Sequence, residues 1–242
     1  MKGSKHALNW TTLLIAIPVG CAASLVTLLF RETIEFINQL LFGRSNDITE
    51  SLHLWPWIFW PVLVGVGGLL AGFFLRYAVA IEQQQTVKTD YLEVINARLD
   101  VVPTKTSLFR ALSSIASIGS GASIGKEGPM VQLAALCGSI IGRVLPGALQ
   151  LKNSDVVAMA AAAGLSSVYH APLASAIFVA EIAFGMSALQ RLIPLVVSSA
   201  VAVMTMWTLG FRNALYPLAD VSFTMDSYSL LITILIGLLS GL

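Results

Sequence analysis

Two long stretches without a charged residue constrain this chain more than any other feature of its sequence. Residues 9–30 contain no Lys, Arg, Asp or Glu, and residues 55–75 form a second stretch of the same kind. About 20 apolar residues are enough for a helix to cross a bilayer. The second stretch begins with Trp55, Trp57 and Trp60, and tryptophan is enriched where a helix meets the membrane surface. We therefore expect two membrane-spanning helices in this part of the chain.

The low charge of the whole chain excludes several classes of protein. Its 14 Lys and Arg and its 13 Asp and Glu make up 11% of 242 residues, and 56% of the residues are hydrophobic. A soluble domain carries about 25% charged residues, so a soluble globular enzyme is nearly excluded. A disordered chain is excluded because the hydrophobic content is far too high. The formal net charge of +1 gives no indication of nucleic-acid binding.

The second half of the chain predicts shorter helices. Residues 107–242 hold only 11 charges, and Gly and Pro divide them into apolar pieces, several of which are too short to cross about 30 Å of hydrocarbon. Discontinuous helices occur where backbone lines a cavity within a membrane protein. We predict an all-α polytopic membrane protein with tilted, discontinuous helices; the alternative is that short helices only fill a large bundle. The pieces are 107–118, 129–142, 155–169, 172–189, 192–211 and 228–242.

The distribution of Lys and Arg predicts the orientation in the membrane. The tail 1–8 contains two and the polar segment 76–106 contains four, whereas residues 31–54 contain two beside four acids. Cytoplasmic loops carry the excess of Lys and Arg, so we expect 1–8 and 76–106 inside and 31–54 outside. Residues 1–242 are typical of a single transmembrane domain. Because Leu242 lies within an apolar run, we expect the N-terminal part of a longer protein.

A glycine-rich run at residues 119–129 is the strongest indication of a binding site. Its sequence is GSGASIGKEGP, and Pro129 suits the first residue of a helix. A helix that begins near Gly128 would direct its free N–H groups and the positive end of its dipole towards this run. Such an arrangement binds anions through the backbone. Within a membrane it can replace part of the hydration of an anion without binding it too tightly for release.

Two charged residues, Lys126 and Glu127, occupy this run. A charge in the middle of a membrane costs about 2.5–3.5 kcal/mol on insertion scales, so their presence requires a reason. In the functional interpretation, the carboxylate of Glu127 occupies the anion site and leaves it when protonated or displaced. In the structural interpretation, the two residues form an ion pair or a turn at the interface.

The same run allows a second function from another class. Residues 121–125 match the G-x-S-x-G pattern of hydrolases, and His170 follows on a later piece. Ser123 and His170 could therefore form the nucleophile and base of an intramembrane serine hydrolase. The pattern is short, however, and a hydrolase elbow follows a strand that this sequence does not predict.

Two runs of the sequence resemble the signatures of the CLC chloride channel family. Residues 125–129 (GKEGP), followed by Val131 and Gln132, are similar to GREGP-x-VQ, and the pair formed by 160–164 and 170–174 is similar to GAAAGL…NAPLAG. Residues 89–93 resemble a bacterial branch of this family. The resemblance implies one anion pore per subunit of a homodimer in a bacterial inner membrane. It also implies a fold of two inverted halves, of which this chain would supply the first.

The resemblance implies roles for individual residues, with chloride as the permeant ion and no cofactor. Glu127 matches the gating glutamate of the family. Its GSGIP filter segment aligns with residues 86–90 (TVKTD), where a threonine hydroxyl would have to replace the serine. The stretch 82–106 is either a soluble linker or holds a short helix over 89–97 that directs its N-terminus to the pore. The implied residues of the anion pathway are Gly125, Lys126, Glu127, Gly128, Thr86 and Thr89.

Two further departures bear on function. Lys126 replaces an arginine, which keeps the charge but loses bidentate geometry. Where proton-coupled members have two consecutive glutamates, this chain has Glu181 and Ile182. A proton cannot cross an apolar region without titratable groups, so we expect gated anion flux with weak or no strict proton coupling. We expect the subunits to meet through helices around 172–211; a non-conducting fragment is a further alternative.

Overall fold

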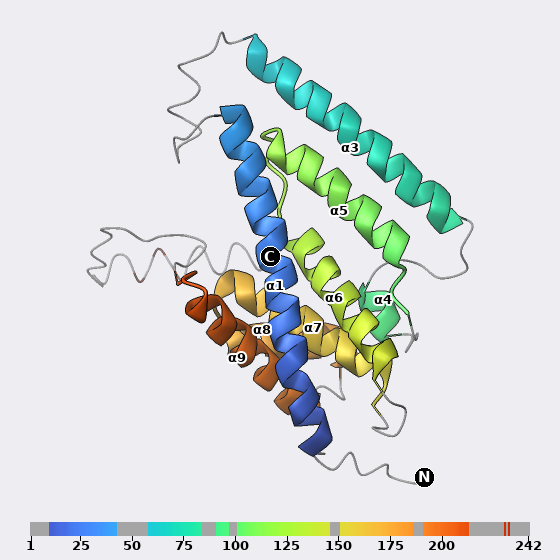
Figure 1. Ribbon diagram of the computed structural model, residues 1–242, viewed down its shortest axis with the longest axis vertical. Coiled ribbons are helices and arrows are strands. Elements are labelled where there is room, and N and C mark those ends of the chain that lie inside the picture. Colours follow the sequence, from blue (N-terminus) through green and yellow to red (C-terminus); the bar gives the residue numbers. More distant parts are fainter. Residues whose placement is uncertain are drawn as a thin grey trace. The chain divides into compact units, whose positions relative to one another are not determined.

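Every regular element in the described part of the chain is an α-helix, which confirms the predicted all-α class. This computed structural model describes residues 10–42, 58–83, 91–96, 101–145, 151–185 and 191–212 of a first compact unit, Met1–Arg212, and residues 230 and 232 of a second, Asn213–Leu242. The helices (Figure 1) are α1 (Trp10–Phe42), α3 (Phe59–Gln83), α4 (Tyr91–Asn96), α5 (Thr104–Gly119), α6 (Glu127–Val144), α7 (Asn153–Tyr169), α8 (Pro172–Phe184) and α9 (Leu192–Thr208).

Helices α1 and α3 are long and apolar enough to cross a membrane, in agreement with the two predicted spans. The 33 residues of α1 extend about 50 Å at 1.5 Å per residue. This length exceeds the ~30 Å of hydrocarbon in a bilayer, so α1 must tilt or project beyond it.

The predicted ends of these two spans are wrong. Residues 31–42 continue α1 instead of beginning a loop, and residues 76–83 continue α3. Within α1, Arg31 donates to Glu35 over 2.7 Å one turn later, and such a pair stabilises a helix. Of the expected linker 76–106, the remaining described residues contain α4, as one of the two alternatives predicted, and the start of α5.

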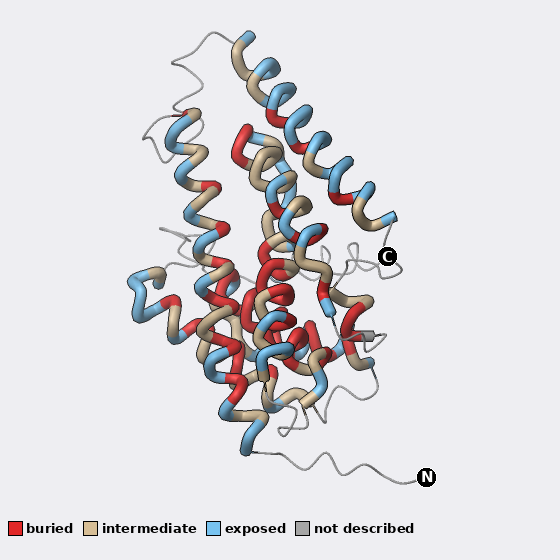
Figure 2. The backbone as a smooth tube through the Cα atoms, turned by 45° about the vertical axis from the view of Figure 1, so that its right-hand side comes forward, coloured by how far each residue is buried: buried red, intermediate tan, exposed pale blue. Residues whose placement is uncertain are grey.

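Helix α7 lies at the centre of the first unit. Helices α1, α6, α8 and α9 pack against it, and 13 of its 17 residues are buried. In Figure 2 the buried residues gather in the middle of the bundle, whereas α3 is exposed along most of its length. Two buried serines join α7 to α9: Ser166 donates to the carbonyl of Ser199, and Ser198 donates to the carbonyl of Met159, both over 3.0 Å.

Small residues allow α6 and α7 to approach closely. A Cβ added to Gly138 would overlap the Cβ of Ala160, and one added to Gly164 would overlap the Cβ of Ala134. Each glycine thus faces an alanine of the other helix. This contact fixes the position of α6 relative to the buried α7.

The glycines of α3 differ in their surroundings. No atom of the described residues lies within 4 Å of a Cβ added to Gly68 or Gly72. The side chain of Ser120 instead fills the space beside Gly67. The close contact of α3 with the end of α5 therefore runs through Gly67.

The start of α7 is held by an ion pair and not by a capping side chain. Lys152 precedes the helix and no side chain caps it. Asp155 lies in the first turn and accepts from Arg191 over 2.5 Å. This ion pair joins the start of α7 to the residue before α9.

We predict that Gly138→Ala destabilises the protein, although alanine is the better helix former. The added Cβ would push α6 away from Ala160 on α7, and overpacking of this kind costs about 1–3 kcal/mol. The melting temperature of the purified protein in detergent should fall.

Gly72→Ala is the matched control for this substitution. It makes the same change within α3 but meets no described atom within 4 Å, so helix propensity alone should act and stabilise by about 0.5–1 kcal/mol. Equal effects of the two variants would contradict the proposed α6–α7 contact.

Candidate functional site

The glycine-rich run connects the end of α5 to the start of α6. After Gly119 the chain turns at Gly121, whose φ of 98° is accessible to glycine at no steric penalty. The amides of Gly121 and Ala122 donate to carbonyls of the last turn of α5, over 3.0 and 3.1 Å. The run therefore ends α5 with its carbonyls satisfied and returns the chain towards α6.

Helix α6 begins at Glu127, one residue before the predicted start. Its first helical hydrogen bond runs from the amide of Met130 to the carbonyl of Lys126, over 3.3 Å. Pro129 is therefore the third residue of the helix, where its missing N–H has no intrahelical partner to lose. The amides of Glu127 and Gly128 precede this first bond, so the positive end of the helix dipole points into the glycine-rich run.

The side chain of Glu127 folds back over this run. A Cβ added to Gly125 would lie 2.7 Å from Oε2 of Glu127, so the absence of a side chain at Gly125 leaves room for the carboxylate. Glu127 is half-buried. In the described residues the ion pairs are Arg31–Glu35, Arg110–Glu82 and Arg191–Asp155, so the predicted alternative of a Lys126–Glu127 pair is not found there.

A cavity of about 670 Å³ lies beside Glu127. The beginnings of α4, α6 and α8 all contribute to its wall, together with the last turns of α7. Its lining is mainly apolar and contains one carboxylate, that of Glu127. The lining residues are Tyr91, Glu127, Gly128, Val131, Leu165, Tyr169, Ala171, Ala174, Ser175 and Phe178.

The helix beginnings at this cavity differ in how their amides are used. Helix α8 starts with Pro172, and its first helical bond runs from the amide of Ser175 to the carbonyl of Ala171, over 3.0 Å. The intervening amides have no acceptor within the helix. At α4, by contrast, the amide of Tyr91 donates to Oε1 of Gln132 over 3.2 Å.

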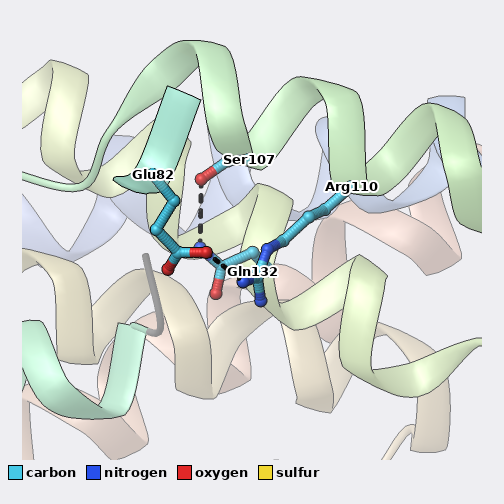
Figure 3. A network of polar contacts seen from close by, with 4 residues as sticks. All are labelled: Glu82, Ser107, Arg110 and Gln132. Atoms are coloured by element: carbon cyan, nitrogen blue, oxygen red, sulfur yellow. Dashed lines mark hydrogen bonds and ion pairs between the residues drawn. The ribbon is translucent and has the colours of Figure 1, made fainter. Parts of the chain in front are cut away.

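Sequence reasoning missed the role of Gln132, although it identified this residue as part of a signature. Its Nε2 donates to the hydroxyl of Ser107 over 3.0 Å. Nearby, Arg110 donates to Glu82 at the end of α3 over 2.7 Å (Figure 3). The resulting polar network joins α3, α4, α5 and α6, and only a three-dimensional arrangement can bring these separate segments together.

The remaining predicted residues are placed as follows. Gly125, Lys126 and Gly128 lie with Glu127 at the start of α6. Thr86 and Thr89 lie outside the described residues. Ile182 is 42% exposed on α8, and its neighbour Glu181 is exposed as well.

The geometry gives no support to the serine hydrolase alternative. A helix, α5, precedes Ser123 where a hydrolase elbow requires a strand. His170 is the C-cap of α7 in the left-handed region (φ 54°) and lies two residues before Pro172, the first residue of α8. Its Nδ1 accepts from Nε1 of Trp207 over 3.3 Å, and no hydrogen bond joins it to Ser123 in the described part of the chain.

Comparison with known proteins agrees with the predicted resemblance. Residues 88–242 match the family described as voltage gated chloride channel. A putative chloride channel protein ClcB-like of Ralstonia nicotianae is 38% identical, with coverage of 95% of this chain and 54% of the relative. The voltage-gated ClC-type chloride channel ClcB of Salmonella typhi is 36% identical, with coverage of 95% and 55%. The chain thus spans about half the length of these curated relatives.

Solved structures share the fold at lower identity. A slow cyanobacterial Cl⁻/H⁺ antiporter superposes with a TM-score of 0.70 at 20% identity, and the match covers 96% of this chain and 54% of that one. A CLC-type fluoride/proton antiporter gives a TM-score of 0.69 at 21% identity, with coverage of 94% and 54%. Coverage of about half of each chain is consistent with the predicted half of an inverted repeat.

Proposed function

The chain belongs to the voltage-gated chloride channel family, and we propose that it forms one wall of a transmembrane chloride pathway gated by Glu127. The observation that carries this proposal is the position of the Glu127 carboxylate. It lies over Gly125 at the start of α6, beside a cavity into which the start of α8 also opens. Gly125, Lys126 and Gly128 complete this part of the pathway.

Electrostatics favour the exchange of a carboxylate for a halide at this place. Helix beginnings present partial positive charge, which stabilises an anion in a medium of low dielectric constant. The same helix beginnings can stabilise either the Glu127 carboxylate or a chloride ion, but the two cannot occupy one position together. When Glu127 is protonated or displaced, the anion takes its place. Because the binding site is formed by partial charges and not by a full positive charge, the anion can leave again.

The proposed proton coupling is weak or absent. The two solved structures are described as proton antiporters, and coupling requires titratable groups along the proton path. At the inner position that the resemblance assigns to a second glutamate, this chain has Ile182. Glu181 remains, but its side chain is exposed and forms no ion pair in the described residues.

The proposed setting is a homodimer in a bacterial inner membrane, where residues 1–242 form a transmembrane domain. The family is one of membrane proteins, and the relatives are bacterial. Contact through helices around 172–211 is supported by large apolar side chains on the outward faces of α8 and α9. The most exposed of these that do not line the cavity are Leu173, Ile193 and Met204.

We predict that Glu127→Ala opens the pathway. In liposomes that hold the full-length protein, chloride efflux should rise by about tenfold, which corresponds to a competitor held by ~1.4 kcal/mol. Efflux should also lose its dependence on pH. Efflux is measured with a chloride electrode, and Glu35→Ala, which removes a carboxylate of α1 that is paired with Arg31, is the control. Unchanged efflux and pH dependence in Glu127→Ala would refute the gate.

Gly125→Ala should move the gate without removing it. The new Cβ would lie 2.7 Å from Oε2 of Glu127, and the flexible carboxylate can yield without loss of stability. We expect a smaller rise in chloride efflux, about threefold, at an unchanged melting temperature. Gly68→Ala, on α3 and outside the cavity lining, meets no described atom within 4 Å and should resemble the parent protein. If both variants behave alike, the placement of the carboxylate over Gly125 is wrong.

We further predict that Ile182→Glu introduces proton movement. Ile182 is 42% exposed, so a carboxylate can be accommodated there and can supply the missing titratable group. A pH-sensitive dye inside the liposomes should report proton uptake driven by a chloride gradient in this variant but not in the parent. Ile177→Glu, on the same helix at 45% exposure, is the control. Strict coupling in the parent protein would contradict the proposal.

A further inference from the structure

We propose that Gln132 is a positioning residue of the anion pathway, which fixes Tyr91 of α4 relative to Glu127 of α6. The inference rests on the proposed function, because it assigns a role in selectivity to a residue that does not line the cavity. Tyr91 and Glu127 both line it. Gln132 lies on the same helix as Glu127 and is bonded to the backbone of Tyr91.

The two ends of the Gln132 amide have chemically distinct partners, and Figure 3 shows the partner of its nitrogen, the hydroxyl of Ser107. The oxygen faces the backbone N–H of Tyr91, which can only donate, and the nitrogen donates to the hydroxyl of Ser107. Each end of the amide thus has a matching partner, which fixes the orientation of the amide. Ser107 is fully buried, so a lost partner there would not simply be replaced by bulk water.

Helix α4 depends on such contacts for its position. It contains six residues, and a helix this short is not stable by itself in solution. The side chains of Val94 and Ile95 anchor it because they are almost completely buried. The hydrogen bond to Gln132 adds a directional contact at the end of α4 that faces the cavity, which apolar packing alone cannot supply.

The Arg110–Glu82 ion pair, near Gln132, attaches α3 in a similar way. Ser107 and Arg110 are three residues apart on α5, so they lie on one face of that helix. One contacts Gln132 and the other holds Glu82 at the end of α3. The end of α3 and the start of α4 are thus attached to the same surface formed by α5 and α6.

The experiment compares anion preference in liposomes that hold the full-length protein. The readout is the ratio of chloride to nitrate efflux, which a general loss of folded protein does not change. Gln132→Met keeps the length of the side chain but removes both hydrogen bonds. We expect the ratio to change by about threefold to tenfold, the size expected for the loss of one hydrogen bond. Hydrogen exchange at the amide of Tyr91 should accelerate in the same variant.

Ser107→Ala and Ser113→Ala form a matched pair on α5. Ser107→Ala frees one end of the Gln132 amide and should shift the ratio in the same direction, but less. Ser113 donates instead to the carbonyl of Ala71 on α3, over 2.8 Å, so Ser113→Ala should leave the ratio unchanged. If Gln132→Met does not fold, this pair decides the question.

Two results would overturn the positioning role. One is a parent-like efflux ratio in both Gln132→Met and Ser107→Ala. The other is an equal shift in Ser113→Ala, which would point to general packing. Absence of chloride efflux from the parent protein would refute the proposed function instead; the exchange rate at Tyr91 would then still decide whether Gln132 holds α4.

Discussion

The close contact between α6 and α7 is the constraint on which the site depends. Glycine faces alanine in both directions across this contact, at Gly138 with Ala160 and at Gly164 with Ala134. Because α7 is buried among four other helices, a helix that packs this tightly against it has little freedom to shift. The start of α6, with Glu127, is thereby held beside the end of α7 and the start of α8. Small side chains thus set the geometry of a polar site that they do not touch.

The helices that begin at the cavity differ in how their first amides are bonded. The first amide of α4 is bonded to Gln132, so it contributes to the fold. The amides at the beginnings of α6 and α8 precede the first helical bonds and lie at the cavity. A polar backbone group inside a protein requires a partner. On the α6 side the Glu127 carboxylate lies over Gly125 beside these amides, and in the proposed function an anion takes its place.

Features that depend on local interactions were predicted from the sequence, whereas features that depend on contacts between distant segments were not. The glycine-rich run and the nearby start of α6 depend on local patterns and were predicted, with α6 one residue off. The ends of α1 and α3 were not predicted correctly, because an ion pair such as Arg31–Glu35 lets a helix continue through charged residues. The network of Gln132 joins segments up to 50 positions apart, from Glu82 to Gln132. No periodicity in one segment indicates such a network.

The distribution of charge is consistent with the proposed displacement of the Glu127 carboxylate. The ion pairs of the described residues join Arg31, Arg110 and Arg191 to acids other than Glu127. None of these guanidinium groups therefore adds a charge-assisted bond, about twice as strong as a neutral one, that an entering anion would have to replace. In the proposed pathway, the groups of the cavity wall that favour an anion are the amide dipoles at the start of α6, which can stabilise a carboxylate and a halide alike.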